Sequence, residues 1–355
     1  MVKVRTAFGW RCITGLGATP DFHHGLLGAC RVVNRRTILR GVTTSCREIL
    51  AQAECRWTAL SDAHPSLAPA VELQRQLVGE SIGLFDRLQE LPEIIAAQDP
   101  AALAEKLKRG LPALRGEPVE VPVAILAPSL DRFCRYLADA GAGDVARHLV
   151  ETLESGRMSR GSLLSASLTR NQRAIRMGAT QMGLAPDLVW LVGELATAPL
   201  AQLLQDRLFT TQEGMDRSAP LPSALATWDR GYCPACGSWP ALAEYIGVAR
   251  YLRCSYCGAR WPLQSRRCIY CDETGAAFRT ITPDMGSPHH VLELCDQCGG
   301  YTKATRVAAS IPFPLLPIED LETFGLDRTA AHRGYGRPPL LELGGEATCE
   351  PPSEP

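Results

Sequence analysis

The sequence has no excess of charge of either sign and no long hydrophobic run that is free of charged residues. Its 37 Lys and Arg residues against 38 Asp and Glu residues leave a net charge of −1, so no overall positive field attracts nucleic acid or an acidic membrane surface. The most apolar stretch, residues 185–204, contains Asp187 and Glu194, whereas a membrane span needs about 20 predominantly apolar residues. We therefore expect no membrane insertion.

The beginning of the chain also lacks the apolar segment of a secretory signal. Residues 1–5 lead into polar, glycine-broken sequence instead of roughly 7 to 15 apolar residues. Arg35-Arg36 faintly resemble a twin-arginine export motif, but no apolar run follows them. We therefore predict a cytoplasmic protein, in a compartment where paired cysteines are more often metal ligands or redox groups than structural disulfides.

A length of 355 residues, at roughly 150 residues per domain, predicts about two domains. Residues 1–55 are basic and lack periodicity, which is typical of a flexible arm or of sequence upstream of the true start. In residues 56–220 apolar side chains recur at helical spacing, and this pattern predicts an α-helical domain. Residues 337–355 are rich in Pro and Gly and predict a disordered tail.

The cysteines are concentrated after the helical region. Eight of the 14 form four Cys-x-x-Cys pairs: Cys233/Cys236, Cys254/Cys257, Cys268/Cys271 and Cys295/Cys298. Two cysteines two residues apart can turn both sulfurs toward one metal ion when the chain folds into a tight knuckle. Glycine closes such a turn most easily because it tolerates positive φ, and glycine follows three of the pairs, at Gly237, Gly258 and Gly299.

The spacing of the pairs predicts two separate metal sites. A tetrahedral site needs four ligands, so two knuckles must share one ion. Seventeen residues separate the first two pairs and 23 the last two, close to the roughly 15 to 20 residues of structural four-thiolate sites. The ten residues between the middle pairs suit a hinge between a first module, residues 228–266, and a second module, residues 267–320. Four thiolates accept zinc or a single iron.

Other chemistry must be weighed against these sites. A thiol redox protein would place one Cys-x-x-Cys at the start of a helix after a strand, and an iron–sulfur cluster can also use four cysteines. A nucleic-acid-binding zinc ribbon could use the arginines near the pairs, but residues 228–306 hold nine Lys and Arg against seven Asp and Glu, a small excess for phosphate binding. With no P-loop, dinucleotide fingerprint or nucleophile–base pair in the sequence, we predict no enzyme.

The residues that flank the pairs form a distinctive pattern. Arg250-Tyr-Leu precedes the second pair and Tyr301-Thr-Lys303 follows the fourth, and looser matches extend to Arg56-Trp57, to Glu319-Asp320-Leu321 and to Leu326-Asp327. With the order of the four knuckles, this pattern resembles the formate dehydrogenase accessory protein family (FdhE). The resemblance covers roughly residues 55 to 340.

The resemblance implies an α+β multidomain fold, with an N-terminal α-helical domain before two small four-cysteine modules of the rubredoxin or zinc-ribbon type. It implies a cytoplasmic maturation factor that binds the catalytic subunit of a respiratory formate dehydrogenase before export or assembly, with no catalytic residues of its own. The eight ligands, for two iron or zinc ions, would be Cys233, Cys236, Cys254, Cys257, Cys268, Cys271, Cys295 and Cys298.

A surface for the partner subunit is predicted at Arg253, Arg260 and Trp261. Cationic and aromatic side chains are common anchors of protein interfaces, and these three lie close together in the first module. Self-association into a homo-oligomer is left open.

Overall fold

The computed structural model describes residues 3–6, 9–12, 46–91, 99–117, 119–209, 219–263, 265–282 and 287–338. Most of the predicted arm and residues 339–355 of the predicted tail lie outside these ranges. Within the arm, β1 (Lys3–Thr6) pairs with β2 (Gly9–Cys12), and the first helix begins at Cys46. The helical part therefore starts ten residues before the predicted boundary.

Most helices precede the sheet in the chain, and four of them pack around one central helix, α8. α8 contacts α2, α4, α6 and α7, and it is buried on nearly every side because its residues are apolar all round. By length and composition α8 could also cross a membrane, but 78% of its apolar window is buried inside the structure. The helices are α1 (Cys46–Ala63), α2 (Ala68–Gln89), α3 (Pro100–Lys108), α4 (Val123–Leu137), α5 (Gly143–Glu154), α6 (Arg160–Leu168), α7 (Gln172–Gln181), α8 (Pro186–Phe209) and α9 (Pro220–Ala226).

Local signals in the sequence account for where several helices begin. The side chain of Asp99 accepts a hydrogen bond from the Ala101 amide at the start of α3, and Asn171 caps α7 in the same way. Pro186 opens α8, where a missing N–H costs nothing because that group would have no partner in the helix.

A six-stranded sheet follows the helices, in the order β5-β4-β3-β8-β7-β6. β3 and β8 pair in parallel at its centre, and every other neighbouring pair is antiparallel. Because β3 belongs to the first module and β8 to the second, one sheet runs through both. The strands are β3 (Pro240–Ile246), β4 (Ala249–Cys254), β5 (Arg260–Pro262), β6 (Phe278–Ile281), β7 (His290–Cys295) and β8 (Gly300–Val307).

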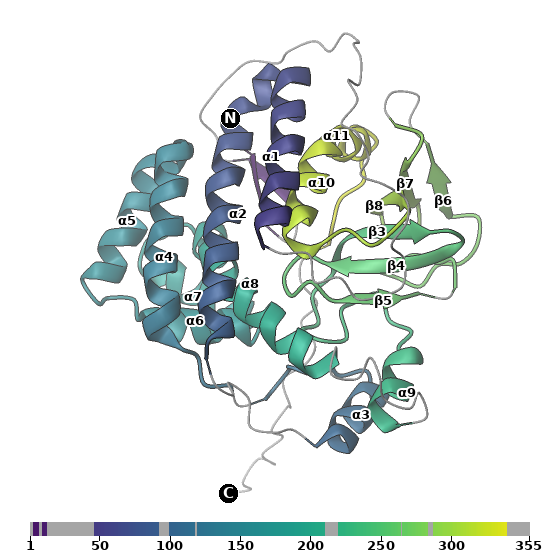
Figure 1. Cartoon of the computed structure of the whole chain (residues 1–355), viewed down its shortest axis with the longest axis horizontal. Helices are drawn as coiled ribbons and strands as arrows, with labels where there is room; N and C mark the ends of the chain where they lie inside the picture. Colours follow the sequence, from purple (N-terminus) through teal and green to yellow (C-terminus); the bar gives the residue numbers. More distant parts are fainter. Residues whose placement is uncertain are drawn as a thin grey trace, which may run out of the picture.

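Two short helices, α10 (Leu316–Glu322) and α11 (Phe324–His332), close the described chain and connect the sheet to the beginning of the fold. α10 packs against α1, as Figure 1 shows near the centre of the molecule. Arg56 on α1 donates to Glu319 at 2.6 Å, and His290 on β7 lies 3.2 Å from the same carboxylate. The sequence motifs at Arg56 and Glu319, 263 residues apart, thus meet in space.

The predicted fold class, an α+β chain with helices first and two four-cysteine modules after them, is confirmed. In Figure 1 the helices α4–α7 lie on one side of α1 and α2, and the sheet lies on the other.

Candidate metal centres

The eight paired cysteines gather into two groups of four. The sulfur atoms of Cys233, Cys236, Cys254 and Cys257 all lie within 4.8 Å of one another, and so do those of Cys268, Cys271, Cys295 and Cys298. Within the groups the closest sulfurs are 3.5 to 3.7 Å apart. Metal–sulfur bonds of about 2.3 Å in a tetrahedron would place the sulfurs about 3.8 Å apart. Both groups could therefore each hold one four-thiolate ion, and the knuckles pair in sequential order.

The knuckles have the backbone conformation that the glycines predict. Gly237, Gly258 and Gly299 have φ values of 81°, 76° and 66°. The amides of Gly237 and Gly299 each donate 2.9 Å hydrogen bonds to the carbonyl of the first cysteine of their pair, which closes the turn. The third knuckle has the same turn with Asp272 at φ 60°, and aspartate is one of the few side chains that tolerates this region.

Backbone amides also point at the sulfurs. The Cys257 amide donates to the Cys254 sulfur at 3.5 Å, and the Tyr270 amide donates to the Cys268 sulfur at the same distance. Such donors favour a thiolate over a thiol because they hydrogen-bond to the charged form. The knuckles thus supply part of the charge stabilisation that four neighbouring thiolates need.

The first group of cysteines is buried between the sheet and the helical part of the chain. Its four cysteines are at most 4% exposed. Amides of Ala113 and Leu114, which follow α3, donate to the carbonyls of Pro234 and Ala235 inside the first knuckle, at 2.7 and 2.9 Å. Tyr256, inside the second knuckle, is buried, and its hydroxyl donates to Thr197 on α8 at 2.9 Å. These contacts seat the first site in the interface between sheet and helices.

A buried cation from the helical part lies beside the first group. The Arg170 side chain is 5% exposed, and its guanidinium lies 4.1 Å from the Tyr256 ring centre and 4.6 Å from that of Trp190. It forms an ion pair with Glu194 at 2.7 Å. Burial alone would lower the pKa of Arg170, but the charges of Glu194, Tyr256 and Cys236 raise it.

The charge on Arg170 has a consequence for the cysteines. Burial alone would raise the pKa of the Cys236 thiol, but hydrogen bonds from the other three cysteines and the charge of Arg170 lower it well below its ordinary value. Four thiolates around a divalent ion carry a net charge of about −2. Arg170 is placed to offset part of that charge in a site that water does not reach.

The second group lies at the surface. Cys268 and Cys295 are 2% and 1% exposed, whereas Cys271 and Cys298 are exposed. Tyr270 packs against the buried Cys268 and Cys295, with its ring 5.0 Å from that of Trp239 in an edge-on arrangement. The two groups therefore share ligand type and turn geometry but differ in their access to solvent.

The predicted partner residues do not form one exposed surface. Arg253 is 4% exposed and forms an ion pair with Glu244 at 2.6 Å, under the segment that contains Ile311. Trp261 is 2% exposed, and its indole N–H donates to the Arg230 carbonyl at 3.0 Å. Arg260 is exposed, with its guanidinium 4.8 Å from the Tyr251 ring centre. Of the three predicted anchors, this structure leaves only Arg260 accessible to a partner.

Sequence reasoning missed Arg170. It lies 63 residues before the first paired cysteine, at the end of a helix, with φ of 60°. No motif surrounds it, and its role depends on α6 and α8 packing against the second knuckle. No signal in the sequence could have pointed to it.

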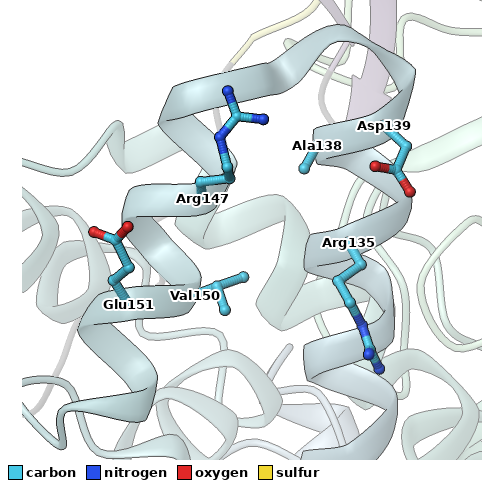
Figure 2. Close-up of a pocket in the computed structure, with 6 residues that line it drawn as sticks. All are labelled: Arg135, Ala138, Asp139, Arg147, Val150 and Glu151. Atoms are coloured by element: carbon cyan, nitrogen blue, oxygen red, sulfur yellow. The ribbon is translucent and has the colours of Figure 1, made fainter.

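A hollow elsewhere in the described chain lies between α4 and α5. It is lined by Arg135, Ala138, Asp139, Arg147, Val150 and Glu151. Figure 2 shows Arg147, Val150 and Glu151 on one helix, Arg135 on the facing helix, and Ala138 and Asp139 on the turn that follows it. The two arginines and two acids balance in charge, and no cysteine or histidine lines the hollow, so we assign it no chemistry.

The chain is similar to known proteins over part of its length. No family model matches the chain. A Protein FdhE homolog of Shewanella oneidensis is 32% identical over 110 residues, covering 29% of this chain and 35% of that protein. Protein FdhE of Escherichia coli O127:H6 is 32% identical over 112 residues, covering 30% of this chain and 36% of that protein. The chain thus matches about a third of the length of these relatives.

The fold has a counterpart among solved structures. The crystal structure of the FdhE protein from Pseudomonas aeruginosa aligns with a TM-score of 0.54 and 24% identity, over 85% of this chain and 99% of that one. At this identity the match establishes the fold. Together with the curated relatives, it confirms the resemblance to the FdhE family that the residues around the cysteine pairs indicate.

Proposed function

We propose that this chain is a non-catalytic accessory factor for formate dehydrogenase, which acts in the cytoplasm on the catalytic subunit before its export or assembly. The observation that carries the proposal is the pair of four-cysteine groups in a fold shared with an FdhE protein. The similarity to Protein FdhE and its homologues adds the link to formate dehydrogenase.

In this proposal the eight cysteines hold two metal ions, zinc or iron, one in each group. Sulfur spacing, turn geometry and amide donors all fit a four-thiolate ion. A bound ion would supply a cross-link between two turns. The chain's own residues do the rest: Tyr256 anchors the first site in the helices, and Arg170 offsets its charge.

The described side chains weigh against the nucleic-acid alternative. The run of arginines that could have contacted phosphate includes Arg250 and Arg253, and both are buried in ion pairs with Glu293 and Glu244. Phosphate contacts need exposed cations. The remaining members of the run are too few for strong salt-dependent binding.

A gene-deletion experiment tests the proposal. Cells that lack the chain should lose formate dehydrogenase activity while the transcript of the enzyme stays unchanged, and the purified chain should oxidise no formate. The full chain should also capture the catalytic subunit in a pull-down. Unchanged enzyme activity in the deletion strain, or tight binding to duplex DNA at physiological salt with no capture of the subunit, would contradict the proposal.

The partner surface can be tested in the same pull-down. Arg260→Glu should weaken capture of the catalytic subunit without releasing metal, because its guanidinium is exposed. Arg266→Glu, which reverses another exposed arginine of the sequence run, is the matched control. Equal capture by the parent and the Arg260 variant would exclude Arg260 as an anchor.

A further inference from the structure

The two cysteine groups differ in one property that ligand type and spacing do not predict, namely solvent access. All four sulfur ligands of the first group are buried, whereas the second group alternates buried and exposed members: Cys268 buried, Cys271 exposed, Cys295 buried and Cys298 exposed. Each exposed cysteine is the second member of its pair. One edge of the second site therefore faces solvent.

The surroundings of that edge are small or polar. Residues 274–276 are Thr, Gly and Ala, and all three are exposed beside the third knuckle. Asp296 and Gln297, between the fourth pair, are exposed as well. Tyr270 packs instead against the cluster of Cys268, Phe278 and Cys295, and its ring contacts that of Trp239. An incoming ligand can reach the metal position from the open edge without displacing the core.

The first group offers no such path. Its knuckles are hydrogen-bonded to the segment after α3 and to α8, and Gly258 lies against Phe313, whose ring carbon would be 2.8 Å from an added Cβ. Access to those sulfurs requires the sheet and helices to separate locally. Opening that exposes a buried core costs a large part of the total stability.

From this contrast we propose that the first site is a fixed structural cross-link and that the second site exchanges its metal ion with soft-ligand partners, through Cys271 and Cys298. The partner is a thiolate, carried either by a small thiol or by a cysteine of a bound peptide. This inference rests on the metal binding set out under the proposed function.

The exchange step is a ligand substitution without oxidation or reduction. The incoming thiolate forms a bond to the metal as the bond to the Cys271 sulfur breaks, and the metal keeps four thiolates and its oxidation state. The released Cys271 thiolate takes a proton from water. A second substitution at Cys298 leaves the metal bound to Cys268, Cys295 and two incoming thiolates. Two further substitutions, by thiolates or by a chelator, replace Cys268 and Cys295 and release the metal with its oxidation state unchanged.

The test uses the zinc-loaded full chain, challenged with EDTA in the presence of reduced glutathione, with the remaining zinc counted by native mass spectrometry. One zinc ion should leave at least about 100-fold faster than the other, since loss of the second needs local unfolding. Among the eight cysteines of the two groups, alkylation with iodoacetamide, read by peptide mass spectrometry, should modify Cys271 and Cys298 first. Omitting glutathione should slow the fast phase, because EDTA alone supplies no incoming thiolate.

Matched variants assign the phases. Cys271→Ser should leave a chain with one slowly released zinc ion, whereas Cys254→Ser, which removes one ligand of the first group, should remove the slow phase or prevent folding. The labelling of the parent chain decides the question even if Cys254→Ser does not fold. Equal release rates, or first labelling at Cys233, Cys236, Cys254 or Cys257, would overturn the inference.

The outcome is separate from that for the proposed function. A chain that binds no metal would remove the basis of both. Two zinc ions with unequal release in a chain whose deletion leaves formate dehydrogenase active would refute the accessory role and leave the inference intact.

Discussion

The buried ion pair between Arg250 on β4 and Glu293 on β7 links the two modules across their shared sheet and should contribute to the stability of the chain. The two side chains are 6% and 1% exposed, and Arg250 donates to both carboxylate oxygens, at 3.0 and 2.5 Å. Tyr245 on β3 donates to the same carboxylate at 2.7 Å. β4 belongs to the first module and β7 to the second, so this carboxylate connects them.

Glu293→Leu would leave a buried guanidinium and a tyrosine hydroxyl without their acceptor. Removing one member of a buried ion pair costs about 3 to 5 kcal/mol of the free energy of unfolding. With a urea dependence of about 3 kcal/mol per M, the unfolding midpoint should fall by about 1 to 2 M. The measurement is urea unfolding of the zinc-loaded full chain, followed by far-UV circular dichroism and tryptophan fluorescence.

Two further variants complete this test. Arg250→Met with Glu293→Leu should recover most of the loss, because apolar side chains of similar size can replace a buried ion pair at little cost. Arg279→Met removes an exposed pair with Asp296, whose members are 44% and 46% exposed, and should leave the midpoint unchanged. If Glu293→Leu unfolds like the parent, the modules do not depend on this contact and the reasoning fails.

Three other predictions follow from buried contacts. Gly258→Ala should destabilise the zinc-loaded chain by more than Gly299→Ala does, because both glycines have positive φ but only Gly258 lies against Phe313. Thermal unfolding compares the two variants, and equal decreases in Tm would refute this prediction. Lys303→Met should cost about 3 to 5 kcal/mol, measured by urea unfolding, because this 1% exposed ammonium pairs with two aspartates at 2.7 Å. Burial alone would raise the pKa of Glu319, but its histidine and arginine partners lower it to about 2. The carboxylate therefore stabilises the fold above its ordinary pKa of 4.5, and this contribution is lost as the pH falls toward 2. Glu319→Gln should flatten the acid dependence of the unfolding midpoint over that range.

Local features of the sequence sufficed to predict the cysteine groups. The two ligands of a knuckle are two residues apart, and the glycine that closes the turn is the next residue, so ligand identity and turn geometry are both properties of a short segment. The sequential pairing of the knuckles followed from their spacing, and the structure confirms it. The third knuckle differs only in using Asp272 where the others use glycine.

The helical region was predictable for a similar reason, except at its start. Apolar spacing revealed the helices from residue 56 onward, but α1 begins at Cys46. Ala53, Trp57 and Leu60, four and three residues apart, form its buried face against α10. The basic composition of the preceding residues concealed this face, and the helix on which it packs lies more than 250 residues later.

Burial, by contrast, was decided by tertiary structure alone. The sequence predicts Arg253 as a surface anchor, but the segment after β8 covers it and Glu244 on β3 pairs with it. Arg170 has no motif, yet the turn between α6 and α7 places it against Tyr256 of the first metal group. The two cysteine groups look alike in sequence. The first is buried because α8, the segment after α3 and Phe313 pack against its knuckles, whereas the second group stays open on one edge. Ligand type and turn conformation depend on neighbours in the chain, whereas solvent access depends on residues that are distant in sequence and meet only in the folded protein.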